Sequence, residues 1–137
     1  MIEKLSTGIE LLEDSNSSNC INRIVVGRGN PQAPLMIIGE APGAKEEEEG
    51  KPFVGRSGKL LDKLLQNAGI DINLDVYFCN VVKCRPPKNR RPTKTEILEN
   101  IPWLYQQIKL VDPHILVLVG ATSSEAVLKT KSPISIL

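Results

Sequence analysis

The sequence has few of the residues from which metal centres and nucleophilic catalytic sites are usually built. It contains one histidine, His114, and three cysteines, no two of which form a CxxC pair. These counts exclude an obvious zinc site and a Ser-His-Asp site. An odd number of cysteines, in a chain that opens without a secretion signal, also argues against disulfides. Metal ligation or simple burial of the thiols is the better starting hypothesis.

Long apolar runs and a strong net charge are also missing. The longest apolar stretches, such as "ILVLV" at 115–119, are too short to span a bilayer, and no charged-then-apolar segment opens the chain, so we expect a cytoplasmic protein. The formal net charge is +1, so any argument for a nucleic-acid partner must come from local clusters of charge. The length of 137 residues fits one domain, over 1–137.

The order of the predicted elements indicates an α/β fold. Helical spacing predicts a helix at 2–13, followed by a loop to about residue 20, and a helix at 58–68 with Ser57 as its N-cap. A further helix is expected from Thr93 or Thr95 to about Leu110, bent or restarted at Pro102, and a short one at 121–130. Strands are expected at 23–27, 35–39, 75–82 and 114–120, the second and fourth buried. This alternation predicts a three-layer α/β/α domain with a central, mostly parallel sheet.

The carboxyl ends of the predicted strands are where a ligand should bind in such a sheet. Three segments leave strands there, namely Gly39 to Gly43, Asn80 with the loop after it, and Gly120 to Thr122. The first two carry the polar and aromatic detail, so we expect the site between them.

The stretch "GEAPG" at 39–43 places a carboxylate on a stiff turn. Gly39 and Gly43 allow backbone conformations that are closed to other residues, and Pro42 fixes one dihedral angle. Such a turn can hold backbone N–H groups around a small polar ligand and keep the Glu40 carboxylate at the strand end. The stretch equally fits an ordinary turn between a strand and a helix, with an incidental carboxylate.

Phe53 and Asn80 each have two readings. Phe53, in the loop "PFVG", is either a core anchor or a face on which a planar base stacks, an interaction of roughly 1–3 kcal/mol. Asn80 ends a strand, and its amide either pairs with the donor–acceptor edge of a pyrimidine or closes a turn. Neither residue alone decides between its two roles.

Charge gathers in two segments of the chain. The loop after Asn80 is stiffened by prolines, and its cations are either solvated or positioned to reach nucleic-acid phosphates. These cations are Lys83, Arg85, Lys88, Arg90 and Arg91. The glutamates at 46–49 would repel a phosphate backbone, so we expect most of them to be solvated, with Glu46 alone close enough to the turn for a pocket role.

Together these segments resemble the iron–sulfur (type 4) uracil-DNA glycosylases, a family first known from thermophiles. The resemblance covers the chain from about Val25 to Thr122 and implies the fold of that family. It rests on "GEAPGAKEEEEGKPFVGRSGKLLDKLL" at 39–65, "VYFCNVVKCRPPKNRRPT" at 76–93 and "QQIKLVDPHILVLVGATS" at 106–123.

The resemblance implies a hydrolase of base excision repair that flips a deaminated base out of DNA and cleaves its N-glycosidic bond. Phe53 would stack on the base and Asn80 would read its edge. Glu40 would position or activate the attacking water, or stabilise the oxocarbenium-like sugar. The residues that match the family's uracil pocket are Glu40, Ala41, Glu46, Phe53 and Asn80, and Ala41 stands where other uracil glycosylases carry an aspartate base.

The sequence departs from the family's pattern in two places. The family holds a [4Fe–4S] cluster through four cysteines. Cys84 matches the third of these positions, Cys20 is a weak match near the N-terminus, and Asn100 falls on the fourth, so we expect the cluster to be absent. The family's H-P-S loop, whose histidine stabilises the departing uracil, has no counterpart before Leu137. We therefore expect that the C-terminal part of the family domain is missing and that this form has weak activity or none.

The principal prediction is a monomeric uracil-DNA glycosylase-like domain that excises uracil from DNA. One alternative is a non-catalytic nucleic-acid-binding module with the same pocket, which would bind an oligonucleotide without releasing a base. The other is a binder of free nucleotides that uses the turns at the strand ends, which a free nucleotide would stabilise more than an oligonucleotide would.

Overall fold

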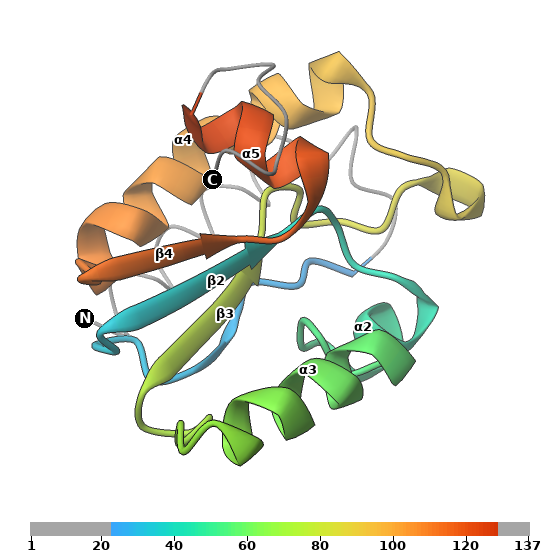
Figure 1. Cartoon of the computed structure of the whole chain (residues 1–137). Helices are drawn as coiled ribbons and strands as arrows, with labels where there is room; N and C mark the ends of the chain where they lie inside the picture. The colour runs from blue at the N-terminus through green and yellow to red at the C-terminus, as the bar shows by residue number, and fades with distance from the viewer. Residues whose placement is uncertain (1–22, 129–137) are drawn as a thin grey trace.

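The computed structural model describes residues 23–128, which form a four-stranded sheet between helices (Figure 1). The strand order is β1-β3-β2-β4; β2 pairs in parallel with β3 and β4, and β1 pairs antiparallel with β3. The strands are β1 (Arg28–Gly29), β2 (Leu35–Gly39), β3 (Val76–Asn80) and β4 (Ile115–Leu118). The helices are α2 (Ala44–Glu49), α3 (Arg56–Asn67), α4 (Lys94–Val111) and α5 (Gly120–Leu128), with a 3₁₀ turn η1 (Pro87–Asn89). The predicted α/β class and mostly parallel sheet are confirmed, whereas the helix predicted at 2–13 and the loop after it lie outside the described residues.

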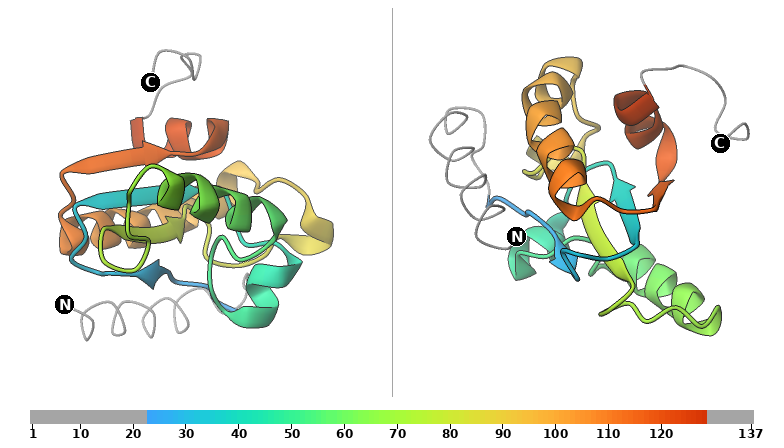
Figure 2. Two further views of the ribbon diagram at one scale, coloured as in Figure 1. Left: turned by 60° about the horizontal axis from the view of Figure 1, so that its bottom comes forward. Right: turned by 90° about the vertical axis from the view of Figure 1, so that its left-hand side faces the viewer.

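Each face of the sheet is covered by its own apolar cluster, which produces the three layers seen in Figure 2. Successive side chains of a strand point to opposite faces. Met36 and Ile38 therefore pack on the side of α4 and α5, while Ile37 packs on the side of α3. A continuous apolar run such as "LMIIG" is what a strand covered on both faces requires.

Several predicted boundaries are wrong. The strand expected at 23–27 is reduced to an isolated bridge between Ile24 and Cys84, and regular pairing begins only at Arg28. The N-cap of α3 is Gly55, not Ser57. The segment of α2 was not predicted as a helix. Thr93 caps α4 as expected, through a hydrogen bond that Glu96 N donates to its hydroxyl.

Two features of the second half of the chain also differ from expectation. Helix α4 runs without interruption through Pro102, so it does not restart there. Strand β4 was expected to be buried, yet Ile115 is 60% exposed and Leu116 and Val117 are also exposed. Within 23–128, β4 pairs with β2 alone and so lies at an edge of the sheet. None of the helices in this range is both long and apolar enough to cross a membrane.

Candidate base pocket at the carboxyl ends of the strands

The centre of the candidate site is Gly39, where β2 and β3 end side by side. Gly39 pairs with Asn80 in the sheet register. A Cβ atom at Gly39 would lie 2.6 Å from Asn80 Oδ1 and 2.6 Å from Phe53 Cζ. Only glycine leaves room for both side chains here, because real Cβ atoms do not approach other heavy atoms that closely. The structure therefore brings Phe53 and Asn80 together, with Glu40 as the next residue of the chain.

The Asn80 side chain has polar atoms that no residue of 23–128 engages. The residue is 4% exposed, and no hydrogen bond within 23–128 involves its side-chain amide. In the described range Glu47 Oε2 is the only fully buried side-chain polar atom without a hydrogen-bond partner, so the Asn80 amide keeps contact with solvent and is open to a ligand. Within 23–128 the amide closes no turn, and its role in reading a base stays a prediction.

Phe53 contributes both to the core and to this pocket. Its ring centroid lies 5.6 Å from that of Phe78, with 49° between the ring planes, so it packs on the cluster beneath α3. It nevertheless remains partly exposed. Both readings of Phe53 are therefore compatible with its position, because one side of the ring can pack while the other stays available.

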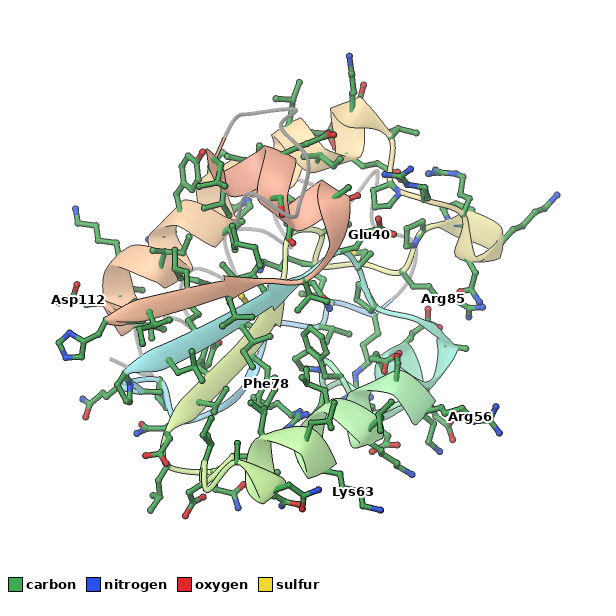
Figure 3. All side chains as sticks on the ribbon, viewed as in Figure 1. Glu40, Arg56, Lys63, Phe78, Arg85 and Asp112 are labelled. Atoms are coloured by element: carbon green, nitrogen blue, oxygen red, sulfur yellow. The ribbon has the colours of Figure 1, made fainter. Side chains whose placement is uncertain are left out.

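Glu40 lies at the edge of the sheet to which β2 points, as Figure 3 shows, at the end opposite to Asp112. Its side chain is 39% exposed, Thr122 Oγ1 donates a 2.6 Å hydrogen bond to Glu40 Oε2, and Arg91 Nε lies 3.8 Å from the same oxygen. Arg91 Nη2 also donates to Thr122 Oγ1, at 3.3 Å. Thr122 is a site residue that sequence reasoning missed, although it lies in the third segment that leaves a strand at this edge.

Glu46 joins the turn at Gly43 to the loop that carries Phe53. Gly43 N donates to Oε1 at 3.0 Å, and Val54 N and Gly55 N donate to Oε2 at 3.0 and 2.7 Å. Both carboxylate oxygens therefore accept hydrogen bonds from the backbone, so Glu46 shapes the pocket by holding two loops together. Ala41 is partly buried and packs against the core cluster on the α4 face of the sheet.

Lys83 does not lie on the basic rim where it was expected. It is 2% exposed, and its Nζ donates to the carbonyl oxygen of Asn80 and to Gln107 Oε1. Gln107 Nε2 in turn donates to Tyr77 Oη at 3.4 Å and to Val26 O at 3.0 Å. The prediction that Lys83 reaches a phosphate is wrong for this structure, because its ammonium is enclosed by the core.

The pKa values of Lys83 and its neighbours are shifted in the directions expected for buried groups. Burial lowers the pKa of the Lys83 ammonium, an effect that the nearby Cys79 opposes. Burial likewise raises the pKa of the Cys79 thiol and that of the Tyr77 hydroxyl. Each shift favours the neutral form of its group, as expected for side chains in a low-dielectric interior.

The remaining cations of the basic loop are surface residues that are partly engaged by carboxylates. Arg90 forms two hydrogen bonds with Glu96, at 2.7 and 3.0 Å, which raise the pKa of the Arg90 guanidinium and lower that of the Glu96 carboxyl. Arg85 donates to Asn89 Oδ1 at 2.7 Å and lies 3.9 Å from Glu47. Lys88 is exposed. This loop is therefore less strongly positive than its sequence indicates.

A second group of cations lies next to the Phe53 loop and was not predicted. A cavity of about 460 Å³ is lined by the loop residues Val54 and Gly55 and by three basic side chains. These are Lys45, Arg56 and Lys59. In Figure 3, Arg56 marks the start of α3. Spacing along the chain hides this group, because Lys45 belongs to a different helix from the other two.

The cysteines do not fit a four-thiolate cluster. Cys84 is disulfide-bonded, so the expectation against disulfides is wrong for this residue. Cys79 is fully buried in the sheet, and Cys20 lies outside the described part of the chain. At the family's fourth ligand position, Asn100 carries an amide that accepts from Lys83 N at 3.1 Å and donates to Glu96 O at 2.7 Å. These 137 residues contain only three cysteines, so they cannot supply four thiolates.

Comparison with known proteins identifies the family of the chain. A profile of the uracil DNA glycosylase superfamily matches residues 26–136. The type-4 uracil-DNA glycosylase of Thermotoga maritima is 48% identical over 73% of this chain and 52% of its own length. The corresponding proteins of Saccharolobus solfataricus and Pyrobaculum aerophilum are 48% and 44% identical, each over 77% of this chain and over 49% and 53% of their own lengths.

The chain thus spans about half the length of these curated relatives. The matched region contains the whole of the candidate pocket, from Gly39 to Thr122. The resemblance seen in the motifs is confirmed, and the chain belongs to the uracil DNA glycosylase superfamily, with type-4 enzymes among its relatives.

Proposed function

We propose that this chain carries the base-recognition and water-positioning part of a uracil-DNA glycosylase, which hydrolyses the N-glycosidic bond of uracil in DNA. The observation that carries the proposal is the convergence of Phe53 and an unpartnered Asn80 amide on Gly39, next to the Glu40 carboxylate. A planar face, a donor–acceptor edge and an anion at one strand end are together suited to a flipped pyrimidine.

In this proposal the base stacks on Phe53 while Asn80 reads its edge. Asn80 Oδ1 would accept from uracil N3–H, and Nδ2 would donate to O4. Cytosine presents an acceptor and a donor at the corresponding positions, so the same amide orientation would reject it. A buried site that loses a hydrogen-bond partner discriminates strongly, because its polar groups are then left unpaired.

Glu40 is the catalytic residue of the proposal. As the bond between C1′ and N1 breaks, uracil takes the electron pair and the sugar gains positive charge. A carboxylate held beside that carbon can stabilise the charge and orient the water that attacks it. The hydrogen bond from Thr122 fixes one carboxylate oxygen, which keeps the other available for water or sugar.

The backbone of the DNA would contact basic side chains on both sides of the pocket. On one side are the predicted Arg85, Lys88, Arg90 and Arg91, without Lys83; on the other are Lys45, Arg56 and Lys59. Lys59→Ala should weaken oligonucleotide binding and reduce its salt dependence by about one counterion. Lys63→Ala is the matched control, because Lys63 is an exposed lysine one turn further along α3 and outside the cavity lining. Equal effects of the two variants would argue against this surface.

We further propose that the chain acts as a cytoplasmic monomer that does not bind a [4Fe–4S] cluster. The type-4 family holds that cluster through cysteines, and the cysteine count here does not meet its requirement. Anaerobically purified chain should therefore contain far fewer than four irons per molecule. Iron and sulfide analysis at about four per chain would contradict the proposal.

The test of the function is uracil release from a single-uracil oligonucleotide. Even slow release should disappear in Glu40→Gln and persist in Glu48→Gln, which removes an exposed charge from α2. Release that is unchanged in Glu40→Gln would exclude Glu40 as the catalytic group. Binding of the uracil oligonucleotide without any release would leave recognition as the activity of this chain.

A further inference from the structure

Phe53 has a backbone conformation that phenylalanine rarely adopts. Its φ angle is 58°, in the left-handed region. Such a conformation is strained and persists only where the surroundings impose it. Other residues must therefore hold the Phe53 backbone in this conformation, and with it the direction of the ring.

The contacts of Arg28, in β1, provide the constraint. Arg28 Nε donates to the carbonyl oxygen of Pro52 at 2.7 Å, and Nη2 donates to that of Phe53 at 3.0 Å. The first carbonyl belongs to the peptide group before the Phe53 α-carbon and the second to the group after it. A planar guanidinium that holds both groups restricts φ and ψ of Phe53 together. Asp62 Oδ1 accepts from the same Nη2 at 2.8 Å and balances the charge of this largely buried side chain.

The same guanidinium also supports the aromatic ring. Its central carbon lies 3.9 Å from the centroid of Phe78, the ring on which Phe53 packs. Figure 3 shows Phe78 between the sheet and α3. Gly58, in the first turn of α3, lies so close that a Cβ there would collide with the Phe53 carbonyl group. Arg28 in β1 and Gly58 in α3 thus both contact the Phe53 backbone. Arg28 also supports Phe78, the ring on which Phe53 packs.

We propose that Arg28 is a positioning residue that fixes the Phe53 ring relative to the Asn80 amide and so sets how sharply the pocket discriminates a base. The Arg28 guanidinium donates to the carbonyl oxygens of Pro52 and Phe53 and to Asp62. The proposed effect of Arg28 on a bound base therefore acts through Phe53. The effect on base binding rests on the proposed function, whereas the effect on the ring does not.

The position of the ring can be followed without any ligand. The chain contains two phenylalanines, so a sample labelled with 4-fluorophenylalanine gives two ¹⁹F signals, which Phe53→Leu assigns. In Arg28→Lys the Phe53 signal should shift and broaden, because an ammonium is a point donor that cannot bridge both carbonyls. Folded Arg28→Met should shift the Phe53 signal further than Arg28→Lys does. If Arg28→Met does not fold, the Arg28→Lys spectrum decides the question. Arg23→Met is the control, since Arg23 donates to the Glu48 carbonyl and not to the Phe53 loop.

The second measurement is the ratio of the affinities for otherwise identical uracil and cytosine oligonucleotides. Arg28→Lys should lower this ratio about 10-fold in the presence of Phe53 and less than about 2-fold in a Phe53→Ala background, as a double-mutant cycle. Equal reductions in both backgrounds, or an unchanged ¹⁹F signal in Arg28→Lys, would overturn the inference. If the parent chain shows no preference for uracil, the proposed function fails, and the ¹⁹F result alone then decides whether Arg28 positions the ring.

Discussion

Gly39→Ala is the substitution that most directly fills the candidate pocket. The added methyl group would lie 2.6 Å from Asn80 Oδ1 and 2.6 Å from Phe53 Cζ, with Phe53 Cε1 at 3.3 Å. Both side chains must move, since neither distance is tolerated by a real Cβ. The variant therefore separates the two groups that we propose contact the base, without removing either of them.

The expected loss follows from the two contacts. Stacking of a base on an aromatic ring contributes about 1–3 kcal/mol, and a neutral hydrogen bond about 0.5–1.5 kcal/mol. If most of both is lost, about 2–4 kcal/mol disappears, which corresponds to roughly a 30- to 700-fold change in affinity. Overpacking of this kind also costs about 1–3 kcal/mol of folding stability.

The assay is the affinity for a uracil oligonucleotide measured beside thermal unfolding. Gly69→Ala is the control, because Gly69 follows α3 with a φ angle of 84° and nothing within 4 Å of an added Cβ; backbone strain should lower stability without a comparable loss of uracil binding. The reasoning is refuted if folded Gly39→Ala binds uracil DNA within about 3-fold of the parent chain, or if Gly69→Ala loses as much affinity.

Three further predictions concern groups around the site. Thr122→Val, which removes the hydroxyl that holds Glu40, should lower the rate of uracil release about 10-fold at little cost in binding. Thr122→Ser keeps a hydroxyl and should release uracil at the parent rate. Equal rates in Thr122→Val and the parent chain would show that the hydrogen bond is incidental. Gln107→Leu should cost about 3 kcal/mol in urea unfolding because the buried Lys83 loses an acceptor, whereas Gln107→Leu with Lys83→Met should cost less; additive losses would contradict this. The pKa of the Glu96 carboxyl is lowered, mainly by its hydrogen bonds from an arginine, so its contribution to stability is complete above the ordinary value of 4.5 and is lost as pH falls through the lowered one. Glu96→Gln should therefore flatten the acid side of the stability profile, and an unchanged slope would contradict the assignment.

Local patterns predicted the centre of this fold well. Strands β2 and β3 are short apolar or β-branched runs that end at Gly39 and Asn80, and the parallel arrangement brings those ends together. Because that edge of the sheet follows from the order of the elements, the segments that lie there could be named from the chain alone. The roles of Glu40, Phe53 and Asn80 came from the family resemblance and stay predictions.

The errors arose where distant residues determine local structure. The helix that begins at Ala44 is only six residues long, and Glu46 stabilises it by linking Gly43 to the loop after Phe53. A run of charges gives no indication of such contacts. Lys83 was misplaced for the same reason, since its acceptor Gln107 is 24 positions further along the chain.

The arginine that holds the Phe53 loop was not recognised either. Arg28 lies 25 residues before the backbone that it contacts, in a strand of two residues with no apolar periodicity. Its effect depends on a strained φ angle at Phe53, which propensities do not reveal because phenylalanine rarely adopts it.

The central claim is that Phe53 and Asn80 form one pocket for uracil in DNA. Its most direct test is the affinity of the chain for two oligonucleotides that differ only in one uracil or cytosine, repeated with Asn80→Ala. We predict at least about 10-fold tighter binding of the uracil strand by the parent chain, and loss of that preference in Asn80→Ala with little change for cytosine. Equal affinities for both strands in the parent chain, or a preference that survives Asn80→Ala, would contradict the account.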